Sequence, residues 1–298
     1  MANAVYVAIK HGYRHIDTAF IYQNENEVGD GIERAIREGL VKREALFVTT
    51  KCWLTYLRQD RVEQCLKKSL ENLKLDYVDL YLVHWPMALK QTDESNFPEN
   101  SDGLIEIDET IEPIETWKAF EALKKLNLVR SLGVSNFNSI QLQSLLAACS
   151  IKPTVNQIEC HPYLNQDALI RICHENEIRV ISYCPLGSTP PASSKGHSSN
   201  LNPKSPRLLD DPIVKELAKK YGKSEAQILI RYHIEKQLIV IPKSINEERI
   251  KQNLQVFDFE LTPEDLARLN GLQKPYRYCT FDLKGLNFHK EYPFSAEY

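Results

Sequence analysis

Short apolar runs alternate along the chain with longer segments in which apolar residues recur every three or four positions. The runs have the length of buried strands and lie at residues 15–18, 46–52, 78–85, 131–135, 155–159, 180–184 and 238–243. The amphipathic segments predict helices at residues 61–73, 114–125, 139–148, 167–175 and 211–220. Strands that alternate with helices predict βαβ units and a parallel sheet.

This pattern favours an α/β fold, a (β/α)8 barrel of the TIM type whose first strand is missing. Closure at eight strands removes every sheet edge, whereas seven strands leave two edges unpaired. Residues 4–9 are apolar enough for another strand, but we interpret them as a helix before the turn at Gly12. The length of 298 residues suits a single barrel domain over residues 1–298.

Three connections are longer than ordinary loops, at residues 87–112, 186–210 and 271–298. The first two follow strands, at the face where barrel active sites lie. The third is a tail that could place an aromatic wall over that face through Tyr276, Tyr278, Phe281, Phe288, Tyr292, Phe294 and Tyr298. The alternative is a docked terminal segment without a ligand role.

Composition and charge narrow the class of protein. A net charge of -3 gives no bulk attraction to nucleic acid or membranes. No apolar run reaches the ~18 residues of a membrane span, and the first residues lack the pattern of a secretory signal, so we expect a cytoplasmic protein. The seven cysteines are scattered without C-x-x-C, which argues against a disulfide framework and a zinc site.

Candidate chemistry begins at residues 12–22, where a short apolar strand ends on Asp17 and Tyr22 follows five residues later. Asn24 and Glu27 have the spacing of a capping box, which predicts that a helix starts there. A carboxylate at a strand end and a phenol on the next loop can face one cleft. The alternative is that Asp17 caps local backbone donors and Tyr22 packs beneath the helix.

Two further strand ends carry Lys51 and His84. A phenol is a weak acid near neutral pH, but a neighbouring ammonium lowers its pKa. Asp17 would hold Lys51 charged, Tyr22 would protonate a carbonyl oxygen, and His84 would orient that oxygen. Taken singly, Lys51 could instead extend its ammonium to solvent and His84 could be an ordinary core histidine.

No protein nucleophile is evident, because the chain has no G-x-S-x-G, H-E-x-x-H, P-loop or G-x-G-x-x-G motif. A hydride-carrying cofactor bound without a Rossmann motif fits these absences. Lys243 and Arg249 flank a helix start near residue 246, where backbone N–H groups favour an anion. A surface cluster of solvated charges is the alternative there.

Other strand ends offer groups suited to a nicotinamide. Tyr183 has a flat ring, and Ser135, Asn136 and Gln157 have hydroxyl or amide groups that suit a carboxamide. Any of these three polar residues could instead satisfy local backbone groups.

The sequence resembles the aldo-keto reductases over essentially its whole length. The motifs that carry this resemblance are GYRHIDTA at 12–19 followed by Tyr22, LVHWP at 82–86, GVSNF at 133–137, NQIE at 156–159 and IPKS at 241–244. The resemblance implies a (β/α)8 barrel that binds NADP(H) and reduces aldehydes or ketones to alcohols. Family members begin with a hairpin and a first barrel strand, whereas this sequence opens inside the following helix.

The resemblance also implies roles for residues. Asp17, Tyr22, Lys51 and His84 match the catalytic set, with Tyr22 as general acid. The positions that match cofactor contacts are Ser135, Asn136, Gln157, Tyr183, Leu186, Ser188, Lys243, Ser244, Arg249, Gln252 and Asn253. The positions that match the substrate pocket in the aldose and aldehyde reductase branch are His84, Trp53, Trp85 and Cys279.

We therefore expect an NADPH-dependent carbonyl reductase that acts as a monomer on a small-molecule substrate. Sugar aldehydes, lipid aldehydes and steroid ketones all stay open as substrates. One alternative is an NADP(H)-binding regulatory or structural protein whose catalysis is impaired because the first strand is absent. Another is a barrel hydrolase with paired acids, such as Asp17 and Glu159.

Overall fold

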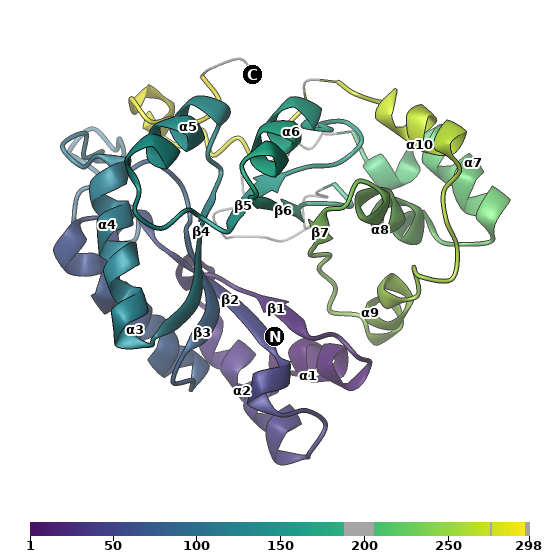
Figure 1. The fold of residues 1–298 in the computed structure, drawn as a ribbon, viewed down its shortest axis with the longest axis horizontal. Coiled ribbons are helices and arrows are strands. Elements are labelled where there is room, and N and C mark those ends of the chain that lie inside the picture. The colour runs from purple at the N-terminus through teal and green to yellow at the C-terminus, as the bar shows by residue number, and fades with distance from the viewer. Residues whose placement is uncertain (188–205, 275, 296–298) are drawn as a thin grey trace. The chain divides into compact units, whose positions relative to one another are not determined.

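A computed structural model describes residues 1–187, 206–274 and 276–295 (Figure 1). The chain forms two compact units, of which the first contains Met1–Asn156 and Leu283–Tyr298 and the second Gln157–Asp282. The expectation of one barrel domain stays a prediction.

The described residues form a sheet of seven strands, which are neighbours in the order in which they occur in the chain. The strands are β1 (His15–Asp17), β2 (Phe47–Cys52), β3 (Val78–Val83), β4 (Val129–Ser135), β5 (Val155–Glu159), β6 (Arg179–Tyr183) and β7 (Ile239–Val240). In the first unit β1 to β4 pair in parallel, as do β6 and β7 in the second. The parallel α/β fold expected from the alternating pattern is confirmed.

Four strands are shorter than the apolar runs that predicted them, and β3 and β7 lose the most residues. The run at 238–243 yields only the two residues of β7, because Pro242 has no N–H with which to continue the ladder. The run at 78–85 gives a strand that ends at Val83, so His84 and Trp85 lie just beyond it. Side chains that follow a parallel strand are well placed to form a site at the sheet edge.

The helices of the first unit are α1 (Ala2–Lys10), α2 (Glu25–Arg37), α3 (Gln59–Leu73), α4 (Pro113–Leu123) and α5 (Ser139–Ala148). Residues 4–9 lie within α1, so the helical interpretation of this segment is confirmed. Gly31 on α2 lets the two helices approach closely, since a Cβ there would lie 2.6 Å from the Ala2 carbonyl oxygen. In Figure 1 the helices α3 and α4 lie side by side along the outer side of the strands, as their contacts require.

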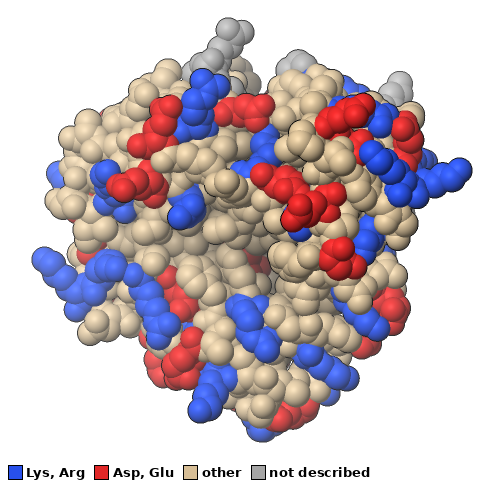
Figure 2. Space-filling view, turned by 45° about the vertical axis from the view of Figure 1, so that its right-hand side comes forward, with Lys and Arg blue, Asp and Glu red and all other residues tan. Residues whose placement is uncertain are grey.

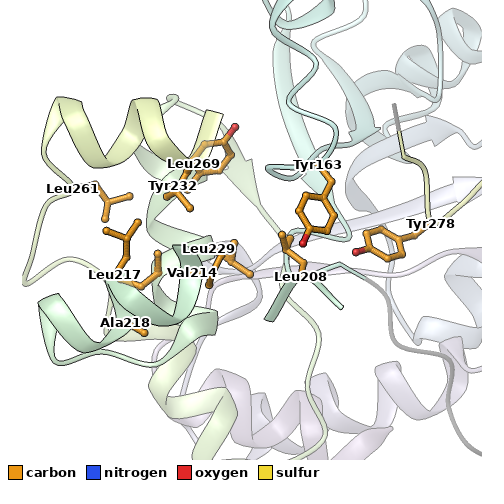
Figure 3. Close-up of a cluster of buried hydrophobic side chains, with 11 residues drawn as sticks. Tyr163, Leu208, Val214, Leu217, Ala218, Leu229, Tyr232, Leu261, Leu269 and Tyr278 are labelled. Carbon is orange, nitrogen blue, oxygen red and sulfur yellow. The ribbon is translucent and has the colours of Figure 1, made fainter. Parts of the chain in front are cut away.

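The helices of the second unit are α6 (Asp167–Glu175), α7 (Pro212–Tyr221), α8 (Glu225–Glu235), α9 (Glu247–Leu254) and α10 (Pro263–Asn270). The amphipathic pattern did not predict α8 and α10. Buried side chains from α7, α8 and α10 form a hydrophobic cluster, which Tyr163, Leu208, Leu261 and Tyr278 join from outside these helices (Figure 3). Burial of this apolar surface stabilises the unit.

Short 3-10 helices occupy several connections of both units: η1 (Phe20–Tyr22), η2 (Arg43–Ala45), η3 (Leu54–Tyr56), η4 (Lys124–Leu126), η5 (Leu208–Asp210) and η6 (Leu286–Phe288). The tail from Leu283 belongs to the first unit and is held by the capping residues of α5. Asn138 donates to the Pro293 carbonyl at 3.0 Å, and Gln141 donates to the Glu291 carbonyl at 2.9 Å. The tail therefore docks by hydrogen bonds as well as by its aromatic rings.

The predicted capping box at the start of α2 is wrong in its hydrogen bonds. Asn24 occupies the N-cap position, but its side chain caps no backbone N–H of the helix. The Glu27 carboxylate instead contacts the amino group of Met1. The predicted start of the helix is confirmed, because Asn24 is the N-cap residue of α2.

A close approach explains the glycine of the GVSNF motif. A Cβ at Gly133 would lie 2.7 Å from Leu82 Cδ2 and 2.8 Å from the Val155 carbonyl oxygen. Any larger residue would push β4 away from its neighbours.

Charged side chains of both signs are interspersed on the face of the molecule shown in Figure 2. This mixture agrees with the small net charge of -3. None of the helices in the described ranges is long and apolar enough to cross a membrane.

Candidate active site

Four residues that the sequence predicted as catalytic lie at the carboxyl ends of neighbouring strands in the first unit. Asp17 is the last residue of β1, Lys51 is next to last in β2, and His84 directly follows β3. Tyr22 ends the short helix η1. Because β1, β2 and β3 pair in parallel, their carboxyl ends share one edge, and the structure brings the four side chains together there.

Lys51 is the centre of this cluster. Its side chain is fully buried, forms an ion pair with Asp17, and donates to the Thr18 carbonyl oxygen at 2.8 Å. Burial alone would lower the pKa of Lys51, but the negative charge of Asp17 and the interactions of the ammonium with Asp17 and Tyr22 outweigh it and raise that pKa above its usual value. Lys51 is thus a buried ammonium, and the alternative in which it reaches solvent is wrong.

Tyr22 lies beside this ammonium and keeps an exposed surface. The Lys51 Nζ atom is 5.3 Å from the centre of the Tyr22 ring, and the Tyr22 and His84 rings meet edge to face at 5.9 Å. Tyr22 is 51% exposed, although Lys51 and His84 are buried. A small molecule can therefore reach the phenol while Lys51 stays out of water.

His84 is held neutral. Burial first, and then the nearby charge of Lys51, lower the pKa of His84 well below its usual value. Its Nδ1 atom is buried without a hydrogen-bond partner among the described residues. A buried N–H without an acceptor is rarer in proteins than an under-satisfied acceptor, so we assign the proton of the neutral ring to Nε2. His84 can then donate a hydrogen bond from Nε2.

The polar pair after β4 serves the same edge. Ser135 ends β4 and is buried, and Asn136 follows with a left-handed backbone at φ +62°. The Asn136 side-chain amide donates to the His84 carbonyl at 2.9 Å and to Ser135 Oγ at 3.1 Å. Asn136 thus makes the local contacts expected under the alternative interpretation, and these contacts fix the backbone of His84.

Two of the predicted substrate residues also belong to the first unit. Trp53 lies edge to face with His84 at 5.5 Å and with Phe97 at 5.2 Å, and its indole N–H donates to the Asn96 carbonyl at 2.7 Å. Trp85 packs against Phe294 of the tail at 5.7 Å. Aromatic residues of the long loop and of the tail thus do contact predicted substrate residues.

The other predicted cofactor residues lie in the second unit. Gln157 is buried in β5, Tyr183 is the last residue of β6, and Leu186 packs against the hydrophobic cluster. Ser188 lies outside the described residues. Cys279, predicted to line the substrate pocket, lies close to the end of β6. Its Sγ is 3.6 Å from the Sγ of Cys184, the residue that directly follows Tyr183.

The predicted phosphate site lies around the start of α9. The Asn246 side chain caps the helix by accepting from the Arg249 N–H at 3.0 Å, and Ser244 Oγ accepts from the Asn246 N–H at 3.1 Å. Lys243, Arg249 and Gln252 are exposed, while Asn253 is buried. Neither Lys243 nor Arg249 forms an ion pair within the part of the chain that the structure describes. Two unpaired cations beside a capped helix start suit a phosphate group.

The sequence did not reveal the structural role of one residue in the second unit, Glu159. Glu159 was considered only as a hydrolytic acid, but it accepts hydrogen bonds from the backbone of Tyr278 and Cys279. The signal for this role was available, because an acidic residue in an apolar strand needs buried donors.

The fold and the site define a class: a parallel α/β protein with a buried ammonium, a reachable phenol and a neutral histidine at one strand edge. Such a set transfers protons to or from an oxygen and lacks a nucleophile of its own.

Comparisons with known proteins identify the family. The sequence pattern of the Aldo/keto reductase family matches residues 1–274. The chain is 45% identical over 301 residues to "Aldo-keto reductase family 1 member C15" of Rattus norvegicus, covering 100% of this chain and 89% of that protein. It is 46% identical over 303 residues to "Aldo-keto reductase family 1 member A1" of Homo sapiens, covering 99% and 90%.

Solved structures agree. The aldose reductase of Schistosoma japonicum is similar with a TM-score of 0.90 and 39% identity, covering 100% of this chain and 91% of that one. A Bombyx mori aldo-keto reductase, solved in complex with NADP, gives a TM-score of 0.85 and 43% identity over 98% of this chain and 88% of that one. The chain belongs to the aldo/keto reductase family, and it is an NADP(H)-dependent oxidoreductase of carbonyl compounds. The hydrolase alternative is thereby overturned, and the binding-protein alternative is not favoured.

Proposed function

We propose that Tyr22 is the general acid with which this enzyme reduces an aldehyde or ketone to an alcohol. The observation that carries the proposal is the contact set of Lys51, which is buried, ion-paired with Asp17 and adjacent to the Tyr22 ring. When Tyr22 gives its proton to the substrate oxygen, negative charge forms on the phenol oxygen. The Lys51 ammonium, which is itself fully buried, stabilises that charge.

Asp17 and His84 assist Tyr22 and Lys51 in the proton transfer. Asp17 keeps Lys51 charged and holds it in place, since an unpaired buried ammonium would lose its proton. His84 donates from Nε2 to the carbonyl oxygen and orients it toward Tyr22. In the reverse direction, the oxidation of an alcohol, Tyr22 takes the proton back.

The residues suit NADP(H) as the cofactor, which supplies or accepts the hydride when bound. We propose that Ser135, Asn136 and Gln157 bind the carboxamide and that Tyr183 stacks on the nicotinamide. Lys243, Ser244 and Arg249 would hold the adenosine phosphate, with Gln252, Asn253, Leu186 and Ser188 at the remaining contacts. Two unpaired cations favour the phosphorylated cofactor over NADH, because an extra phosphate gives each cation a charge-assisted hydrogen bond.

We further propose that the seven strands are those of a (β/α)8 barrel, in which an eighth strand would lie beside β1. The protein would then act as a monomeric, cytoplasmic enzyme with a single barrel domain over residues 1–298. Size-exclusion chromatography with light scattering tests the monomer, because a stable dimer would elute at twice the mass of 34.4 kDa. Fractionation of cells tests the location.

The decisive experiment follows the hydride. The enzyme is incubated with a panel of aldehydes and NADPH labelled with deuterium at C4 of the nicotinamide. We expect NADPH consumption that equals alcohol formation, with the label on the carbinol carbon. Consumption of NADPH without formation of alcohol would contradict direct hydride transfer. So would an alcohol that carries no deuterium whichever face of the nicotinamide was labelled.

A further inference from the structure

A buried carboxylate in the second unit holds the tail segment that carries Cys279. Glu159, the last residue of β5, is 1% exposed. Its Oε1 accepts from the Tyr278 N–H at 2.6 Å and its Oε2 accepts from the Cys279 N–H at 3.0 Å. The two donors are consecutive backbone groups more than a hundred residues away in the chain.

His161 supports this carboxylate from the other side. Its Nε2 lies 2.9 Å from Glu159 Oε1, and the ring is fully buried. Because a carboxylate only accepts, we place the proton of the ring on Nε2. Glu159 therefore receives three hydrogen bonds.

The same segment is held by its side chains. The Tyr278 ring meets His161 edge to face at 4.9 Å, and its hydroxyl donates to the Pro206 carbonyl at 2.6 Å. Tyr278 also joins the hydrophobic cluster at the end where Tyr163 and Leu208 lie (Figure 3). Directional hydrogen bonds combined with side-chain packing fix a chain segment in one position.

The place is next to the proposed nicotinamide site. Cys279 Sγ is 3.6 Å from Cys184 Sγ, and Cys184 directly follows Tyr183 at the end of β6. A carbonyl that accepts hydride must lie over the nicotinamide ring, and Tyr183 is the residue proposed to stack on that ring. The segment that Glu159 holds is thus beside Tyr183, and it carries Cys279, which the resemblance to the family assigns to the substrate pocket.

We propose that Glu159 is a positioning residue that fixes Tyr278 and Cys279 and thereby sets the affinity for the carbonyl substrate. The inference rests on the proposed function, since it assigns the segment to that substrate. The segment that carries Tyr278 and Cys279 then contributes to substrate specificity. Its position depends on the Glu159 carboxylate and on His161.

Glu159→Gln separates positioning from folding. The amide keeps one acceptor oxygen but turns an NH₂ group toward a backbone N–H, so one of the two tail contacts is lost. Loss of a contact made equally in the ground and transition states raises KM and leaves kcat nearly unchanged. We expect KM for a bulky aromatic aldehyde to rise about tenfold, with kcat and the Kd of NADPH within about twofold of the wild type.

Two further variants should raise KM by amounts that differ from the effect of Glu159→Gln. Glu159→Ala removes both acceptors and is expected to raise KM more than Glu159→Gln. His161→Gln retains an N–H donor for Glu159, so its effect is expected to be smaller. The matched control is Glu175→Gln, which removes the same charge from an exposed position on α6 of the same unit.

The thiol pair supplies a readout that needs no catalysis. Diamide takes up two electrons and two protons from a pair of close thiols, which become a disulfide. In the wild type we expect a link between Cys184 and Cys279, identified by peptide mass spectrometry of the native protein. Glu159→Gln should form this link more slowly, because Cys279 is no longer held beside Cys184, whereas Glu175→Gln should not.

These measurements are independent of one another. An unchanged KM in Glu159→Gln, or a fall of kcat accompanied by a rise of similar size in the Kd of NADPH, would overturn the positioning role. If the wild type reduces no carbonyl at all, the proposed function fails, while an altered rate of thiol linkage in Glu159→Gln would still show that Glu159 holds the segment. An unaltered rate of linkage in a folded Glu159→Gln protein would contradict even that contact.

Discussion

The proposed catalytic cluster of the first unit and the proposed phosphate site of the second unit are built on opposite principles. Lys51 is fully buried and its charge is matched by Asp17 before any ligand arrives. Lys243 and Arg249 are exposed, and neither has an ion-pair partner in the described residues. Chemistry that depends on a shifted proton affinity needs burial, whereas capture of a charged ligand needs cations that are free to meet it. Mutations should therefore affect the two sites through different kinetic constants.

The largest effect should follow from Tyr22→Phe. The substitution removes only the hydroxyl, so the ring contacts with His84 and Lys51 can remain. General acid catalysis contributes about 10²–10⁴-fold, so kcat should fall by at least that factor while the Kd of NADPH stays the same. Steady-state turnover and NADPH fluorescence titration measure the two. Tyr6→Phe on α1 is the matched control. Near-normal turnover in Tyr22→Phe would contradict the proposal that Tyr22 is the general acid.

Removal of the buried ammonium should affect both activity and stability. Lys51→Met leaves the Asp17 carboxylate, whose side chain is only 10% exposed, without its partner. Breaking a buried pair from one side costs about 3–5 kcal/mol in the free energy of unfolding. Urea denaturation should show this loss in Lys51→Met, and Asp17→Asn added to it should recover part of the stability. Additive losses in the double variant would mean that the two groups do not interact. Lys67→Met on the surface of α3 serves as the control.

A smaller effect, confined to binding, is expected at the phosphate site. Arg249→Ala should raise KM for NADPH about 10–100-fold, the range of one or two charge-assisted hydrogen bonds, and should leave kcat unchanged. KM for NADH should change little, because that cofactor lacks the extra phosphate. Arg171→Ala, exposed on α6, controls for loss of charge. Equal changes for both cofactors would place Arg249 elsewhere on the ligand.

The smallest effect concerns pH. Because burial and the charge of Lys51 lower the pKa of His84, kcat/KM should show no inflection near pH ~6.5, the usual value for histidine. An inflection there that disappears in His84→Gln, but not in the exposed control His174→Gln, would contradict a neutral His84.

The same lowered pKa has a defined sign for stability. Below pH ~6.5 the unfolded chain protonates His84 and the folded protein does not. The contribution of His84 is therefore fully present above that pH and is lost as pH falls toward the lowered pKa. Thermal unfolding of the wild type and of His84→Gln, compared across this window, checks the sign.

Much of the fold could be predicted from the alternation of apolar runs and amphipathic segments. The run at 155–159 and the segments at 139–148 and 167–175 have the bounds of β5, α5 and α6. The pattern located these elements because burial on a sheet or on one helix face leaves a periodic record in the sequence. It overestimated β7, where Pro242 ends the hydrogen-bonded ladder although the residues stay apolar.

The positions of the apolar runs were enough to show which residue types stand at the strand ends, and therefore that an acid, a lysine, a phenol and a histidine are available for proton transfer. Only the tertiary structure decided that Lys51 is buried against Asp17, that Asn24 caps nothing with its side chain, and that Glu159 holds the backbone of Tyr278 and Cys279. The physical reason is that periodicity reports which side of an element is buried. The partner of a buried charge is chosen by segments far away in the chain, and only folding brings these together.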